Sequence, residues 1–151
     1  MPQIVLETLI HATPERCFDL SIDVDVHQAS VGNTGERAVG GVTSGPMHLG
    51  DEVTWEERHL GKVRRLTSKI TEYDRPHRFV DEMVRGAFKS FRHEHRFVPD
   101  SEGTRMSDRF EYRSPLGWLG RLADELVLRR YMTRLLETRN GHIKAAAERV
   151  V

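Results

Sequence analysis

Apolar and polar residues alternate along much of the chain before residue 114, which is the pattern of half-buried β-strands. The strand-like runs are residues 3–11, 52–59, 62–73, 78–84, 88–98 and 104–113. Short breaks containing Gly, Pro and Asp separate the last five runs, and connections of this length predict antiparallel hairpins. We therefore expect one antiparallel sheet.

Two short helices are expected directly after the first strand. Thr13 and Pro14 are typical of a helix N-cap and a first helical position, and a second short turn is expected over residues 23–29. Residues 31–50 contain six glycines, which predicts loops around one weak strand. With that strand, the predicted sheet has about seven strands.

After residue 114 the spacing of apolar residues changes to the period of an α-helix. The residues that fall on one side of this helix are Trp118, Leu122, Leu126, Met132, Leu136, Ile143 and Ala147. Arg130 and Arg134 point away from that side. The pattern predicts one long terminal helix over residues 117–149.

The alternation also assigns side chains to the two faces of the sheet. In residues 89–97, aromatic residues and histidines alternate with charged residues. The charged set should face water, which places His93 and His95 on the inner face. The length of the following turn then places Asp108 opposite or diagonal to His93.

The same alternation of inward and outward residues, continued through the turn at residues 74–77, assigns Asp81 to the inner face. A β-bulge at Gly86 would bring Glu82 inward in its place. The sequence leaves both arrangements open.

The predicted inner face mixes large apolar residues with ionisable ones, and a fully packed core would not tolerate so many ionisable groups. We therefore expect a cavity between the sheet and the long helix, with the make-up of a small-molecule site. The predicted ligand contacts are Trp55, Glu57, His59, Phe79, Asp81, Met83, Phe91, His93, His95, Met106, Asp108, Phe110 and Leu126.

The ionisable residues on the inner face can also be explained in two other ways, both of which pair them with one another. They can form satisfied buried pairs, with Glu57 opposite Arg64 and a histidine beside Asp108 or Asp81. Alternatively, His93 or His95 acts as a general base and Asp108 orients it, because a carboxylate behind a histidine fixes its tautomer. These three residues are the candidate catalytic group.

A metal is a weaker hypothesis. His93 and His95 form a His-x-His pair on one face of a strand, and His59 or Asp81 could supply a further ligand for zinc or iron. A bare His-x-His motif has low specificity. We predict no metal and no cofactor.

Composition narrows the classes of function. The 23 basic and 23 acidic residues give a formal net charge of zero, so no global field attracts nucleic acid or an anionic membrane. The single cysteine, Cys17, cannot form an internal disulfide and is expected to be buried, and no run is apolar enough to span a membrane. We expect one cytoplasmic domain over residues 1–151 that binds no nucleic acid.

One stretch of the chain resembles a known superfamily. The run GDEVTWEERHLGKVRRLTSKITEYDRPHRFVDEMVRGAFKSFRHEHRF, followed by the 104–113 strand, SPLG and the terminal helix, is similar to small bacterial cyclase/dehydrase-like members of the START/polyketide-cyclase superfamily. This superfamily is also called SRPBCC, birch-allergen-like or helix-grip, and the likeness spans nearly the whole chain.

The resemblance implies an α+β helix-grip fold, in which a curved antiparallel sheet wraps round the C-terminal helix and encloses a hydrophobic tunnel. Relatives use this tunnel to bind lipids, quinones, plant hormones or polyketides, and some of them cyclise or dehydrate the ligand. The resemblance carries no residue-level catalytic motif onto this chain, and function in such a fold depends on the site. We expect a non-catalytic protein that binds a small hydrophobic molecule (a lipid, a quinone or a polyketide-like compound). The alternative is a cyclase or dehydratase that uses the inward His/Asp pair for acid–base catalysis.

Overall fold

The computed structural model describes residues 2–59, 61–114 and 127–149. Within these residues, seven strands form one sheet in the order β1-β7-β6-β5-β4-β3-β2, and every neighbouring pair is antiparallel. The strands are β1 (Gln3–Ile10), β2 (Arg37–Gly41), β3 (Glu52–His59), β4 (Lys62–Asp74), β5 (Arg78–Arg85), β6 (Ser90–Asp100) and β7 (Gly103–Arg113).

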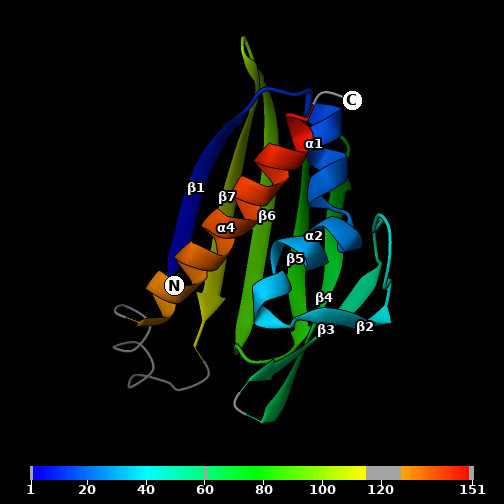
Figure 1. Ribbon diagram of the computed structural model, residues 1–151, viewed down its shortest axis with the longest axis vertical. Coiled ribbons are helices and arrows are strands. Elements are labelled where there is room, and N and C mark those ends of the chain that lie inside the picture. The colour runs from blue at the N-terminus through cyan, green and yellow to red at the C-terminus, as the bar shows by residue number, and fades with distance from the viewer. Residues whose placement is uncertain (1, 60, 115–126, 150–151) are drawn as a thin grey trace.

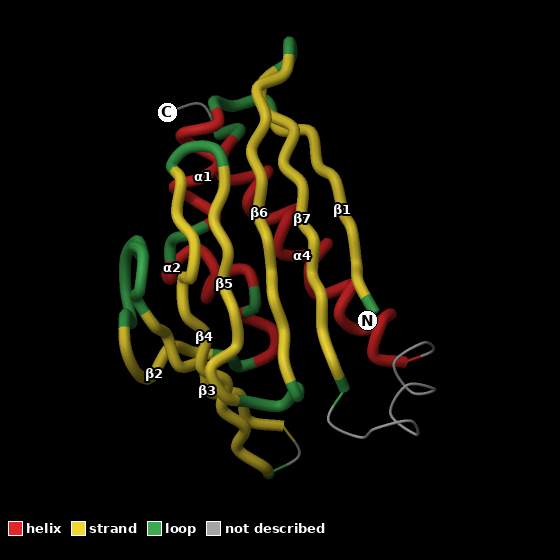
Figure 2. Tube along the Cα trace, turned by 180° about the vertical axis from the view of Figure 1, so that it is seen from behind, coloured by secondary structure: helices red, strands yellow, loops and turns green. Residues whose placement is uncertain are grey.

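The helices of the described residues all cover one face of this sheet. They are α1 (Pro14–Ser21), α2 (Val24–Ser30), the short 3-10 helix η1 (Gly32–Thr34) and α4 (Arg129–Ala147). Figure 1 shows α4 running diagonally across β6 and β7, with α1 and α2 beside it, and Figure 2 shows the uncovered face from behind. The predicted α+β helix-grip fold is therefore confirmed.

Both short helices begin where the sequence predicts, because side chains cap their first turns. Thr13 accepts a hydrogen bond from the backbone N–H of Arg16, and Pro14 follows as the first helical residue. Asp23 accepts one from the N–H of Val26 at the start of α2. These caps fix how the chain passes from the strand β1 to the helices that cover the cavity.

The β6–β7 hairpin sets the register of the central strands. His95 lies opposite Asp108 and His93 lies opposite Phe110, so Asp108 is diagonal to His93, as predicted. The predicted break at residues 99–103 is too long, since β6 continues through Pro99 to Asp100. The proline is tolerated because the register between β5 and β6 ends at Arg96, which leaves β6 without a neighbouring strand on that side.

Two register shifts interrupt the pairing of β4 with β5. One lies between Thr67 and Ser68, and the other lies between Ile70 and Glu72. Asp81 pairs with Ile70 on one side and with His93 on the other, and its carboxylate contacts the inward His95. Asp81, the residue assigned inward by parity, thus lies on the concave face.

Aromatic side chains of α1 and the sheet form the centre of the core. The Phe18 ring is fully buried, and its centroid lies 5.3 Å from that of Phe79 and 5.5 Å from that of Phe97, in edge-to-face geometry. Cys17 is buried beside it, as expected from the sequence. This packing ties α1 to the middle of the sheet.

The terminal helix is confirmed over Arg129–Ala147, and the predicted part over residues 117–126 lies outside the described residues. Met132, Leu136, Ile143 and Ala147 are buried against the sheet, as the apolar period predicts. No helix in the described part of the chain is long and apolar enough to cross a membrane.

Candidate ligand-binding cavity

A cavity of about 160 Å³ lies between the concave face of the sheet and the helices. Its apolar wall includes Ile22, Val24, Val53, Trp55, Ile70, Phe79, Phe91, Phe110, Met132 and Leu136. Polar residues that also line it are Ser21, Asp23, His27, Glu36, Ser68, Asp81, His93, His95 and Arg139. An apolar wall with a few convergent polar groups is the usual composition of a small-molecule site.

The size of this cavity limits what it can hold without rearrangement. An apolar cavity of about 150 Å³ accommodates a benzene molecule, whereas sites for drug-sized ligands measure roughly 300–1,000 Å³. The cavity therefore has room for a single small ring with short substituents. A longer molecule requires either a wider cavity or a part of the ligand that lies outside it.

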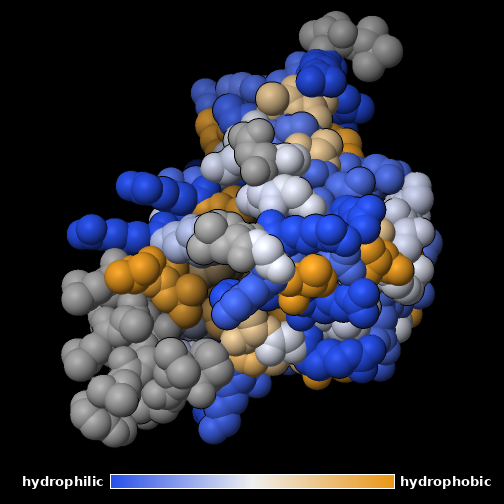
Figure 3. Space-filling view, turned by 60° about the horizontal axis from the view of Figure 1, so that its bottom comes forward, coloured by the Kyte–Doolittle hydropathy of each residue, from blue (hydrophilic) through white to orange (hydrophobic). Residues whose placement is uncertain are grey.

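Hydrophobic side chains are also exposed at the end of the molecule where α4 begins. Val127 and Tyr131 are 70% and 52% exposed. Figure 3 shows hydrophobic groups gathered beside the grey atoms, on a face that is otherwise largely hydrophilic. Leu135, one helical turn further on, lines the cavity, so apolar side chains extend along α4 from the surface to the cavity.

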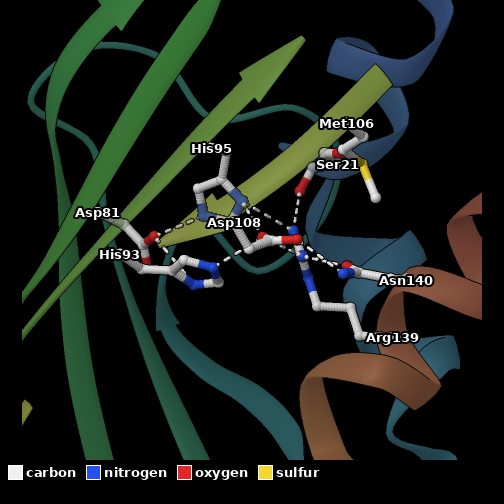
Figure 4. A network of polar contacts seen from close by, with 8 residues as sticks. All are labelled: Ser21, Asp81, His93, His95, Met106, Asp108, Arg139 and Asn140. Carbon is white, nitrogen blue, oxygen red and sulfur yellow. Dashed lines mark hydrogen bonds and ion pairs between the residues drawn. The ribbon is translucent and has the colours of Figure 1, made fainter. Parts of the chain in front are cut away.

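The polar part of the cavity is organised around Asp108 of β7, which is only 1% exposed. His93 Nε2 lies 2.8 Å from Asp108 Oδ1, and His95 Nδ1 lies 3.3 Å from the same oxygen. His95 Nε2 lies 2.9 Å from Asp81 Oδ1. Figure 4 shows the two imidazole rings between the two carboxylates, with Arg139 and Asn140 of α4 on the far side of Asp108.

The helix α4 contributes two buried polar residues to this cluster. Asn140 Nδ2 donates a hydrogen bond of 2.6 Å to Asp108 Oδ2, and Arg139 Nη1 lies 3.6 Å from Asp108 Oδ1. Arg139 also donates to Asn140 Oδ1 and to the backbone carbonyl of Ser21, at 3.2 Å and 3.3 Å. The cluster thus connects the sheet, α4 and the end of α1.

The hydrogen bonds determine which nitrogens carry protons. An ionised carboxylate only accepts hydrogen bonds, so the contact with Asp108 places a proton on His93 Nε2. The other nitrogen, His93 Nδ1, lies 3.9 Å from Asp81 Oδ1, beyond hydrogen-bond distance. In neutral His93 this Nδ1 therefore carries a lone pair that accepts no hydrogen bond from the described residues.

Burial controls the protonation of this cluster. Burial lowers the pKa of His93 to about 4, and the nearby His95 ring adds to the effect, which keeps His93 neutral at neutral pH. Burial alone would raise the pKa of Asp108, but the hydrogen bond from His93 and the adjacent His95 ring outweigh it and hold that pKa well below its usual value. The pKa of Asp81 is lowered in the same way, against burial, mainly by its hydrogen bond from His95.

A metal ion could be held by Asp81, His93 and His95. One possible ligand atom from each lies within 4.8 Å of the others, and two imidazoles with one carboxylate suit a divalent transition metal. Asp108 would then support His93 from behind, as carboxylates do in many metal sites. The hydrogen bonds described above involve the same three side chains, through His93 Nε2, His95 Nε2 and Asp81 Oδ1.

The predicted contact residues fall into three groups. Those that line the cavity are Trp55, Phe79, Asp81, Phe91, His93, His95 and Phe110. Those that do not line it are Glu57, Met83, Met106 and Asp108. Leu126 and the side chain of His59 lie outside the described residues.

The second group has clear structural surroundings. Glu57 lies opposite Arg64 in the β3–β4 register, as predicted, and Met83 packs against the apolar cluster around Phe91 and Phe110. Met106 is buried, with its sulfur 3.6 Å from the Ser21 hydroxyl that donates to it. These three residues are not part of the cavity lining.

Sequence analysis missed Arg139 and Asn140, which are only 5% and 3% exposed. The sequence contained a sign of them. The apolar side of α4 includes Leu136 and Ile143, and the helical period places residues 139 and 140 on that same inward side. Two polar residues at inward positions of a helix indicate a buried polar partner across the interface.

Comparison with known proteins places the chain in a family. The family model described as polyketide cyclase / dehydrase and lipid transport matches residues 1–148, and the chain belongs to this family. No curated protein matches the sequence. The superfamily predicted from the sequence is thereby confirmed.

Solved structures with the same fold come from distant organisms. TTHA0849 from Thermus thermophilus is 22% identical with a TM-score of 0.73, over 97% of this chain and 100% of that one. CV1439 from Chromobacterium violaceum is 13% identical with a TM-score of 0.71, over 98% of each chain. The ginseng major latex-like protein 151 from Panax ginseng is 14% identical with a TM-score of 0.69, again over 98% of each. At these identities the similarity concerns the fold.

Proposed function

We propose that this protein binds one small, largely hydrophobic molecule, of the lipid, quinone or polyketide-like kind, in the cavity between the sheet and α4. It acts as a binding or carrier protein without catalysing a reaction. The observation that carries this proposal is the cavity of about 160 Å³ with an apolar wall and one buried polar cluster. A cytoplasmic location, expected from the sequence, is part of the proposal.

Binding is favoured over catalysis by the state of His93. A general base works best when its pKa lies near the working pH, whereas burial lowers the pKa of His93 to about 4. A base this weak abstracts protons poorly at neutral pH. The family description, which includes lipid transport, is compatible with binding alone.

The proposal is tested by filling the cavity. Ser68 lines it and is only 6% exposed, so Ser68→Leu introduces a larger apolar side chain into the space that the ligand needs. The matched control is Lys69→Leu, the same replacement at the next residue of β4, whose side chain is exposed on the other face of the sheet.

The measurement is an amide NMR titration with para-propylphenol, a single ring with a short apolar tail. We expect saturable shifts at cavity residues in the wild type and in Lys69→Leu, and no saturable shifts in folded Ser68→Leu. Equal binding by all three proteins would place the ligand outside the cavity and reject the proposal.

The second candidate function is acid–base catalysis of the cyclase or dehydratase kind. The contact of 2.8 Å between His93 and Asp108 favours it, because the carboxylate fixes the tautomer that turns the Nδ1 lone pair away from Asp108. Turnover of a hydroxylated polyketide-like substrate should then rise as His93 loses its proton and be lost in His93→Gln. A rate that is unchanged in His93→Gln would eliminate this candidate.

A further inference from the structure

We propose that the buried cluster selects ligands by their polar end: it accepts a group that donates hydrogen bonds, such as a phenol, an alcohol or an amine, and rejects a carboxylate. This inference rests on the proposed binding function and names the chemical class of the ligand. It is carried by the charges and by the hydrogen-bonding atoms that remain available in the cavity.

The buried cluster carries more negative than positive charge. Asp81 and Asp108 are two carboxylates, and Arg139 is the single permanently charged cation that faces them among the described residues. Neutral His93 adds no charge. The cluster therefore offers no excess positive charge to an anionic ligand.

Arg139 is already engaged. Its guanidinium lies 3.6 Å from Asp108 Oδ1, and its Nη atoms donate to Asn140 Oδ1 and to the carbonyl oxygen of Ser21. Its side chain is 7% exposed, so a ligand carboxylate would have to displace these contacts to reach it. Displacing a buried carboxylate from a buried guanidinium is costly, since each is left unpaired.

Asp81 is the most accessible acidic group of the cluster. Its side chain is 22% exposed, compared with 1% for Asp108. One of its oxygens, Oδ1, accepts from His95 Nε2. Within residues 2–59, 61–114 and 127–149, no lysine or arginine nitrogen lies within 4.0 Å of this carboxylate, and its Oδ2 atom has no hydrogen-bond donor.

His93 Nδ1 is a second acceptor beside Asp81. It lies 3.9 Å from Asp81 Oδ1, and the other nitrogen of the ring is committed to Asp108. Both residues line the cavity. Two adjacent acceptors in an apolar cavity match a hydroxyl or ammonium group, and the hydrogen bond to the carboxylate is charge-assisted.

The experiment compares three ligands that share a para-propylphenyl body and differ in their polar end, at neutral pH: para-propylphenol, para-propylbenzylamine and para-propylbenzoate. Each is titrated into the wild-type chain, and dissociation constants are taken from amide NMR shifts. We expect the phenol and the amine to bind at least about tenfold more tightly than the benzoate, as charge-assisted hydrogen bonds imply.

Asp81→Asn removes the charge with little change of shape and should reduce this preference, because the amide can also donate to a carboxylate. Asp74→Asn is the matched control, since it removes one exposed negative charge at the end of β4, away from the cavity lining. The control should retain the wild-type ranking. This comparison separates the local carboxylate from a general change in net charge.

The outcomes distinguish this inference from the binding function itself. Equal or tighter binding of the benzoate by the wild type would overturn the inference while leaving a binding protein. Failure of all three ligands to bind would reject the binding function together with it. The wild-type ranking decides the question even if Asp81→Asn does not fold.

Discussion

Asn140 of α4 donates a hydrogen bond of 2.6 Å to Asp108 of β7, and both side chains are buried. This contact joins the terminal helix to the sheet through a carboxylate that also orients His93. Stability and the polar part of the cavity therefore depend on the same residue.

Replacing Asp108 should be strongly destabilising. Asp108→Asn removes the negative charge beside Arg139 and places one amide group against another at Asn140. Breaking a buried ion pair typically costs about 3–5 kcal/mol, and we expect a loss of this size in urea unfolding.

The matched control is Asp19→Asn, which breaks the ion pair of 2.7 Å between Asp19 and Arg75. That pair is about half exposed, so we expect a loss of about 1 kcal/mol or less. Similar losses in the two variants would show that the buried Asp108 cluster contributes no more to the free energy of unfolding than an exposed ion pair does.

Stability should fall on acidification because His93 stays neutral in the fold. The unfolded chain takes up a proton on His93 near pH 6.5, whereas the folded chain does so only at about 4. Acid therefore favours the unfolded state across this window, by up to about 3 kcal/mol.

The test is urea unfolding of the wild type and of His93→Gln at several pH values between these limits. Glutamine can still donate to Asp108 but does not titrate, so the variant should lose less stability as the pH falls. A variant that follows the wild-type pH dependence throughout would show that His93 is not the group responsible.

Gly41 should tolerate no side chain. It has a φ of +67°, and an added Cβ would collide with the carbonyl oxygen of Glu52 in the neighbouring strand β3. Gly45 has a similar φ of +80° with open space around it. Gly41→Ala should therefore cost about 3 kcal/mol and Gly45→Ala about 1 kcal/mol. Equal losses, measured by thermal unfolding, would mean that backbone conformation alone limits both sites.

The sequence predicted the sheet and its inner face well because both follow from local rules. Alternation along β6 and β7 and the short turn between them place His93, His95 and Asp108 on one face, and the structure has them there. Asp81 also lies inward, although two register shifts in β4–β5 left no clear sign in the sequence.

What the sequence did not predict depends on how distant elements cross. Arg139 and Asn140 were missed because a charged or polar helical residue normally faces water, and their partner Asp108 lies far away in the chain. The volume of the cavity also could not be predicted from the sequence, because it depends on how closely α4 approaches the sheet.

The most direct test of the account is native mass spectrometry of the purified chain mixed with para-propylphenol, under conditions that preserve non-covalent complexes. The account predicts one molecule of the phenol per chain in the wild type and in Lys69→Leu, released on denaturation and absent from folded Ser68→Leu. A wild-type chain that carries no molecule under those conditions would contradict it.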